Sequence, residues 1–172
     1  MALLRWLDDN VEKSVILVCY LAMTGIIFVE VIRRFAFGQQ AAWSSTIPIY
    51  LFLWVTWIGC AYTAKQRSHL RFEEFRARLP YGGQFCCMVL DHLIWIGFSI
   101  MIVTFASEQV WLSYDNFAIV QGTDDVMQWW FYLATPVGFL LVIYRVLQNM
   151  VEDVRRFQRG EPMPIKASEA AD

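Results

Sequence analysis

"AAWSSTIPIYLFLWVTWIGCAYTA", residues 41–64, contains no charged side chain. An α-helix rises about 1.5 Å per residue, so about 20 apolar residues cross a bilayer core about 30 Å thick. The stretch is too long for a soluble strand, and a single strand in lipid would leave its backbone groups unpaired. It therefore predicts a transmembrane helix.

Three other segments have the same character. Residues 14–32 contain one charged side chain, Glu30, while residues 93–107 and 126–144 contain none. The chain is 58% hydrophobic and 17% charged, whereas soluble domains are about 45–50% apolar and about 25% charged. These features predict an all-α integral membrane protein. Its four transmembrane helices are expected at about residues 14–32, 43–64, 88–111 and 126–147.

The distribution of lysine and arginine predicts the orientation of these spans. Basic residues near span ends favour the cytoplasmic side. Residues 1–13, the second connection and the tail together carry twelve of them, whereas the first connection carries only Arg33 and Arg34 and the third carries none. We therefore expect both termini to be cytoplasmic. The net charge of −2 provides no basic field for nucleic acid, so no nucleic-acid partner is expected.

The segments outside the spans divide the rest of the chain. Residues 1–13 place leucines and a valine on one helical face and acids, including Glu12, on the other, which predicts a short interfacial helix. The amphipathic stretch "HLRFEEFRARLP", residues 69–80, predicts a second one. Residues 14–158 form the predicted membrane domain and residues 159–172 a disordered cytoplasmic tail.

The fourth span carries a start signal and a break signal. Asp125 followed by Gln128 three residues later resembles a capping box, which predicts a helix start there. Pro136 lies inside the span and predicts a kink. The helix is expected to continue past Arg145 to about Gln158.

Glu30 is an acid within the first apolar run. It lies about 24 Å along a helix from Ser14, which places it near the outer boundary and not at mid-membrane. Arg33 and Arg34 follow at the i+3 and i+4 spacing of helical ion pairs. Either the three residues form a self-contained cluster that anchors the helix end, or they contact a lipid head group or a partner. A proton-coupling role is the weaker alternative.

The sequence contains few groups suited to catalysis or cofactor binding. The two histidines, His69 and His92, are both expected near the cytoplasmic surface, where a haem-binding pair is conceivable. No cluster of histidine, cysteine and carboxylate has metal-ligand spacing, and no nucleophile has a base within reach. We therefore expect no cofactor, no metal and no enzymatic activity.

The second span carries an aromatic face. Trp43, Tyr50, Trp54 and Trp57 recur at helical spacing, and the two inner tryptophans lie deeper than an interfacial belt explains. The face either packs in the core of the chain or is buried against another membrane subunit, as large aromatics often are.

The order of several motifs resembles one known family. The motifs are "EVIRRFAFGQQAAW" at residues 30–43, "WVTWIGCAY" at residues 54–62 and "HLRFEEFRARLP". Together with the four spans they resemble the small, DctQ-like membrane subunit of tripartite ATP-independent periplasmic (TRAP) transporters, over about residues 10–150. One departure is that Ser44, Ser45 and Thr46 stand where the family often has a pair of acids.

The resemblance implies a function. The chain would be a non-catalytic scaffold of a sodium-coupled importer of an organic acid (a dicarboxylate, sugar acid or sulfonate) in the bacterial inner membrane. Its partners would be a large membrane subunit, a periplasmic substrate-binding protein and membrane phospholipid. The site residues expected from this reading are Glu30, Arg33 and Arg34 for lipid or partner contact, Trp43, Tyr50, Trp54 and Trp57 for the large subunit, and Asp115, Asp124 and Asp125 for the binding protein. Two alternatives are an autonomous small multidrug exporter and a haem-bearing anchor of a respiratory enzyme.

Overall fold

The computed structural model describes residues 2–67 and 78–162, with side chains from residue 10. The helical elements are α1 (Ala2–Phe37), η1 (Ala42–Ser44), α2 (Thr46–Lys65), α4 (Tyr81–Asp115), α5 (Trp129–Tyr132) and α6 (Ala134–Arg159). Within this part of the chain, four helical segments are long and apolar enough to cross a membrane: Asn10–Phe37, Ala42–Lys65, Tyr81–Asp115 and Trp129–Arg159. The all-helical architecture with four candidate spans is therefore confirmed, and the orientation of the termini stays a prediction.

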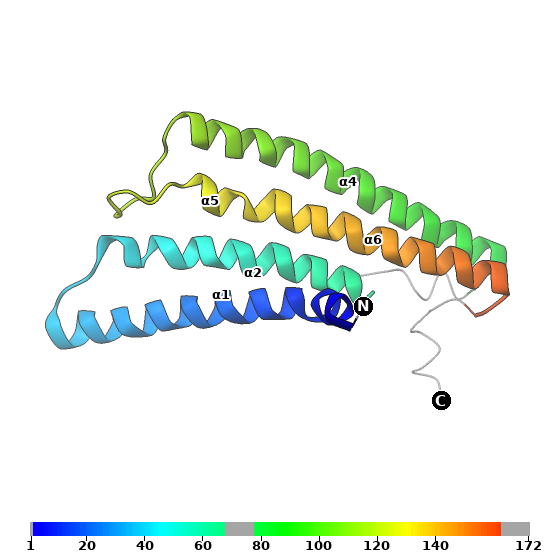
Figure 1. Cartoon of the computed structure of the whole chain (residues 1–172), viewed down its shortest axis with the longest axis horizontal. Helices are drawn as coiled ribbons and strands as arrows, with labels where there is room; N and C mark the ends of the chain where they lie inside the picture. The colour runs from blue at the N-terminus through cyan, green and yellow to red at the C-terminus, as the bar shows by residue number, and fades with distance from the viewer. Residues whose placement is uncertain (1, 68–77, 163–172) are drawn as a thin grey trace.

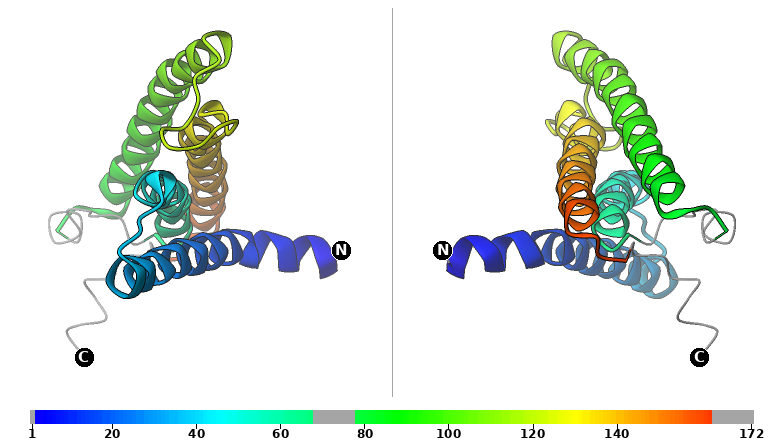
Figure 2. Two further views of the ribbon diagram at one scale, coloured as in Figure 1. Left: turned by 90° about the vertical axis from the view of Figure 1, so that its left-hand side faces the viewer. Right: turned by 90° about the vertical axis from the view of Figure 1, so that its right-hand side faces the viewer.

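The long helices form a row. Helix α1 packs on α2, α2 on α6, and α6 on α4, and no backbone contact joins α1 to α4 or to α6 among the described residues. Figure 1 shows this order across the molecule, and the end-on views of Figure 2 show α1 and α4 at opposite edges. Along the length of the helices, the start of α1 and the end of α6 lie at the same end of the molecule, called here the termini end (Figure 1). The opposite end, which holds the α1–α2 connection and residues 116–128, is called the loop end.

The apolar core lies between the two inner helices. Ala61 and Ala64 of α2 and Phe139, Val142 and Val146 of α6 are buried together. Next to them, Gly138 allows a close approach, because a Cβ atom built on it would lie 2.5 Å from the Cβ atom of Trp57. Small residues at helix interfaces permit this backbone proximity in membrane proteins.

Helix α1 is longer than the first predicted span. An interfacial helix was expected at residues 1–13; from residue 2 on, this segment runs without a break into the span, and α1 covers Ala2–Phe37. The sequence has no proline between positions 2 and 37 that would force a break. The start of α1 projects to one side, beyond the other helices (Figure 2). Its interfacial placement stays a prediction.

The start of the fourth span differs from the prediction. The helix begins at Trp129 with Gln128 as its N-cap residue and no side-chain cap, so the predicted Asp125 capping box is wrong. The residues before it form a turn in which Ile119 and Met127 make an antiparallel bridge. The amide of Gln128 is drawn into this turn, where it donates to the carbonyl of Ala118 at 2.9 Å.

A kink was predicted at Pro136, and the fourth span has a one-residue interruption close to it. The helix is interrupted at Leu133, between α5 and α6, three residues before Pro136. Proline lacks an amide hydrogen and its ring displaces the carbonyl four residues earlier, which accounts for an interruption at this point. Helix α6 ends at Arg159, where Gly160 adopts a left-handed conformation with φ of 67°, close to the predicted end at Gln158.

The loop end is closed by a contact between two connections. Gly122 has φ of 82°, and a Cβ atom on it would lie 2.5 Å from the carbonyl carbon of Ala42. Val120 beside it is buried. The 116–128 turn is therefore packed against the start of η1. The predicted interfacial helix at residues 69–80, including His69, and the predicted tail at 159–172 lie mostly outside the described residues.

Candidate functional site

Glu30 closes the connection between the first two spans. Its side chain is nearly buried, with 9% of the residue exposed, and its Oε1 accepts a hydrogen bond of 2.6 Å from the backbone amide of Ala41. Arg33 lies 3.6 Å from the other carboxylate oxygen. The carboxylate thus ties the end of α1 to the residue before η1. This geometry favours the self-contained cluster among the alternatives for Glu30.

A small cavity lies beside this cluster. It has a volume of about 170 Å³, and its lining includes Glu30, Arg34, Gln40, Ser44 and Ser45. An acid, a base and two hydroxyl groups therefore border one space at the loop end. The cavity is lined by one negative and one positive side chain, Glu30 and Arg34, and these charges complement the two opposite charges of a zwitterionic head group.

The aromatic face of α2 is divided between internal and external contacts. Tyr50 stacks on Phe131 with ring centroids 4.8 Å apart, and Trp57 lies 5.1 Å from Phe139. Trp54 is half-buried and Trp43 is 37% exposed. Tyr50 and Trp57 therefore contribute to packing within the chain, while Trp43 and Trp54 retain surface for another molecule.

The three acids of the third connection are exposed. Asp115 is the last residue of α4, and Asp124 and Asp125 follow the Gly122 turn. The turn positions them at the loop end, on the side of the molecule where the first connection also lies (Figure 1).

A buried ion pair at the termini end was missed by the sequence analysis. Glu12 of α1 is fully buried, and its Oε1 accepts a hydrogen bond of 2.6 Å from Nε of Arg145 on α6, which is also buried. Nζ of Lys65, the last residue of α2, lies 4.0 Å from the second oxygen of Glu12. One carboxylate thus connects three helices.

A second group of charges continues along α6. Asp153 is buried and lies 2.5 Å from an Nη atom of Arg67 and 2.9 Å from Nε2 of His92 on α4. Asn149 donates a hydrogen bond of 2.8 Å to the carbonyl of Ala64 at the end of α2. We call the whole set the buried polar network; its members are Glu12, Lys65, Arg67, His92, Arg145, Asn149 and Asp153.

Arg67 adopts an unusual backbone conformation to join this network. Its φ is 54°, in the left-handed region that glycine favours, and it lies just past the end of α2. Its amide donates to the carbonyl of Ala64 at 3.1 Å, as in a helix-ending turn. The ion pairs of its side chain with Asp153 and Glu152 offset the cost of this conformation.

The network fixes the helices to one another. Its members are engaged with one another, and no group of three potential metal ligands occurs among the described residues. His92, one half of the histidine pair considered for haem, is bound to Asp153. The network holds the helices together, because each buried charge is paired with a charge from a different segment of the chain.

A sequence signal for the network exists in α6. Arg145, Asn149 and Asp153 recur at four-residue intervals, which places them on one helix face. The same face carries Val142 and Val146 deeper in the membrane. A polar stripe that continues a buried apolar stripe indicates a polar interface between helices. Of these three residues, only Arg145 contributes to the predicted orientation, as one of the basic residues of the tail.

Comparison with known proteins identifies the family. The profile of the family described as "Tripartite ATP-independent periplasmic transporters, DctQ component" matches residues 23–156. The chain belongs to the DctQ family. Members of this family are small permease components of TRAP transporters and not enzymes, so the resemblance drawn from the sequence motifs is confirmed.

Three relatives illustrate the similarity. The chain is 24% identical to the C4-dicarboxylate TRAP transporter small permease protein DctQ of Vibrio cholerae, over 81% of this chain and 69% of the relative. It is 22% identical to the sialic acid TRAP transporter small permease protein SiaQ of the same organism, over 87% and 85%. It is 27% identical to the isethionate TRAP transporter permease protein DctMQ of Oleidesulfovibrio alaskensis, over 89% of this chain but only 25% of that longer protein.

Proposed function

We propose that the chain is the non-catalytic scaffold subunit of a sodium-coupled TRAP transporter that imports an organic acid across the bacterial inner membrane. It acts with a large membrane subunit and a periplasmic binding protein, and both its termini are cytoplasmic. The single observation that carries the scaffold role is where the charges lie. The spans contain no charged side chain over residues 14–29, 46–64, 93–107 and 129–144, and the buried charges at the termini end are tied to one another.

This charge distribution speaks against the autonomous exporter. A proton-coupled exporter needs an ionisable group near mid-membrane, where such residues mark ion pathways. Glu30 lies at the loop end of α1 and accepts a hydrogen bond from Ala41. A carboxylate held there by the backbone is suited to fixing a connection and not to carrying protons through the bilayer.

The relatives support the partners and the substrate class. The DctMQ permease contains a region similar to this chain within a protein about four times as long as the matched part, as expected for a small permease that works beside a large one. The printed names of the three relatives refer to C4-dicarboxylate, sialic acid and isethionate, which are all organic acids. Because similar chains accompany different substrates, we assign substrate choice to the partners.

The surfaces of the chain offer separate contacts for each partner. We assign Trp43 and Trp54, with the outer edges of Tyr50 and Trp57, to the large subunit. The loop-end cluster of Glu30, Arg33 and Arg34 holds the first connection, and its adjoining cavity, lined by Glu30 and Arg34, is assigned to contact with a lipid head group or a partner. Asp115, Asp124 and Asp125 are exposed at the same end and are assigned to docking of the binding protein.

Reconstitution tests the proposed function. We expect sodium-driven uptake in proteoliposomes only when this chain is present together with its large subunit and binding protein. Transport by the chain alone would support the exporter, and a Soret band in the purified protein would support the haem anchor. Trp43→Ala with Trp54→Ala should reduce co-purification with the large subunit, whereas Trp111→Ala on α4, which is also exposed, should not. Equal co-purification of all variants would contradict the assigned interface.

A further inference from the structure

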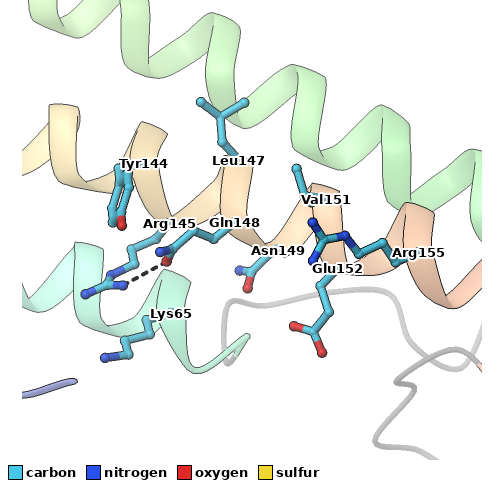
Figure 3. A pocket seen from close by; sticks show the side chains of 9 residues that line it. All are labelled: Lys65, Tyr144, Arg145, Leu147, Gln148, Asn149, Val151, Glu152 and Arg155. Atoms are coloured by element: carbon cyan, nitrogen blue, oxygen red, sulfur yellow. Dashed lines mark hydrogen bonds between the residues drawn. The ribbon is translucent and has the colours of Figure 1, made fainter. Parts of the chain in front are cut away.

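A groove opens on α6 at the termini end, beside the last residue of α2. Its volume is about 700 Å³, and its lining includes Lys65, Tyr144, Leu147, Gln148, Val151 and Arg155 (Figure 3). On α6 these residues recur at intervals of three or four, so they share one helix face. The groove is therefore an open, elongated surface between the inner helices and not an enclosed pocket.

The lining of the groove combines exposed apolar side chains with basic ones. Tyr144, Leu147 and Val151 are each between 42% and 48% exposed, so their side chains are available to an apolar ligand. Lys65 and Arg155 add positive charge at its two sides, and Figure 3 shows the guanidinium group of Arg155 directed back along α6, over Glu152. Long basic side chains commonly lay their apolar stems along apolar surface while the charged head stays in water.

The acids near the groove are occupied. Glu12 behind it is bound to Arg145, and Glu152 in its wall lies 3.1 Å from Arg67 and 2.7 Å from Arg156. Arg155 makes no ion pair with any other residue that the structure describes. Among the described residues that line the groove, the basic side chains Lys65, Arg145 and Arg155 therefore outnumber the one acid, Glu152, which complements an anion.

The groove also begins at the correct depth for a lipid head group. Lys65 ends α2 and Arg145 directly follows the uncharged stretch 129–144, so both mark the edge of the apolar layer. Head-group layers add about 5–8 Å on each side of the hydrocarbon core. Val151 lies about 9 Å beyond Arg145 along the helix, so the groove crosses this layer.

We propose that this groove binds an anionic phospholipid of the inner leaflet. The phosphate lies beside Lys65, with the amide of Gln148 as a further donor and Arg155 as a second positive charge further along α6, and the acyl chains pass over Tyr144 toward the middle of the membrane. Basic pockets between transmembrane helices on the cytoplasmic side are a known setting for such head groups. The inference takes from the proposed function only the orientation with both termini inside. It does not depend on the large subunit.

Lipid binding by the purified chain tests the proposal. We would titrate the protein in detergent with phosphatidylglycerol or phosphatidylcholine of identical acyl chains and count bound lipids by native mass spectrometry. Phosphatidylglycerol should be retained preferentially. Lys65→Gln with Arg155→Gln should lower its affinity by about 30-fold, because each base near an anionic lipid contributes about fivefold. Equal retention of the two lipids, or unchanged affinity in the double variant, would overturn the proposal.

Two controls separate the groove from general surface charge. Arg159→Gln removes an exposed base from the end of α6 outside the groove and should leave the preference for phosphatidylglycerol unchanged. An equal loss in this variant would show that only bulk charge matters. If inorganic phosphate competes as well as the lipid, the groove is a free-anion site and the lipid assignment is wrong.

Arg155→Gln alone, at an exposed position, keeps the test valid if the double variant does not fold. Absence of sodium-driven uptake would contradict the proposed function while leaving these lipid measurements unaffected.

Discussion

Arg145 on α6 and Glu12 on α1 form a buried ion pair between two helices whose backbones do not touch. Helix α2 lies between them and contributes Lys65 to the same carboxylate. The pair therefore reaches around the end of α2 and secures the outer helix α1, which among the described helices otherwise packs only on α2 and η1. Removal of charge in this position should affect the assembly of the row more than local helix formation.

Single and double substitutions of this pair should differ. Arg145→Met leaves Glu12 buried with only distant compensation, and breaking one side of a buried pair costs about 3–5 kcal/mol. Glu12→Leu with Arg145→Met removes both charges and should be close to wild type in stability. Tryptophan fluorescence during denaturant unfolding in detergent measures the difference. Additive losses in the double variant would contradict the role of the pair.

Arg67 offers a test that separates backbone strain from ion pairing. Both Arg67→Gly and Arg67→Ala remove the contact with Asp153, but only glycine is relaxed at the φ of 54° found here. The alanine variant should therefore be less stable than the glycine variant by about 1 kcal/mol, and both should be less stable than wild type. An alanine variant at least as stable as the glycine variant would show that the left-handed conformation is absent.

The contact of Gly138 with Trp57 predicts a steric effect. A methyl group at position 138 would meet the Cβ atom of Trp57 at 2.5 Å, so Gly138→Ala should push α2 and α6 apart and cost about 1–3 kcal/mol. Gly59→Ala on α2 is the matched control, since its Cβ atom would meet nothing within 4 Å. The melting temperature of each variant checks the prediction. Equal melting temperatures would mean that the two helices lie further apart than described.

Glu30 can be tested for structure and for charge separately. Glu30→Gln keeps an oxygen that accepts from the amide of Ala41 but removes the negative charge, whereas Glu30→Ala removes both. If closing the connection is the main role, the glutamine variant should resemble wild type and the alanine variant should lose about 1–3 kcal/mol from an unpaired amide. Thermal unfolding separates the two. Equal losses in both variants would assign the role to the charge instead.

The apolar runs predicted the helices because burial in lipid leaves little choice of structure. A span of uncharged residues such as 41–64 must satisfy its backbone internally, and a helix is the local solution. The arrangement of the helices has no such local signal. Glu12 falls on the polar face of an amphipathic segment, which is compatible with water, lipid head groups or a partner helix. Only the neighbour that supplies Arg145 decides among them.

The start of the fourth span shows the same limit. Asp125 and Gln128 have the correct spacing for a cap, and this local preference is worth about 1 kcal/mol. The bridge between Ile119 and Met127 draws the same residues into a turn packed against η1, and the side chain of Gln128 donates to the hydroxyl group of Tyr132 at 2.8 Å. Contacts between distant segments therefore outweighed the local pattern. The proline signal was read correctly because its steric effect is local.

The single row of helices has a consequence for permeation. Helices packed 8–10 Å apart make a row of four about 35 Å wide and one helix thick. Each long helix of this row contacts only its neighbours in the described part of the chain, with α1 and α4 at opposite edges (Figure 2). In the proposed transporter, such a wall would form one side of a solute path that the large subunit completes.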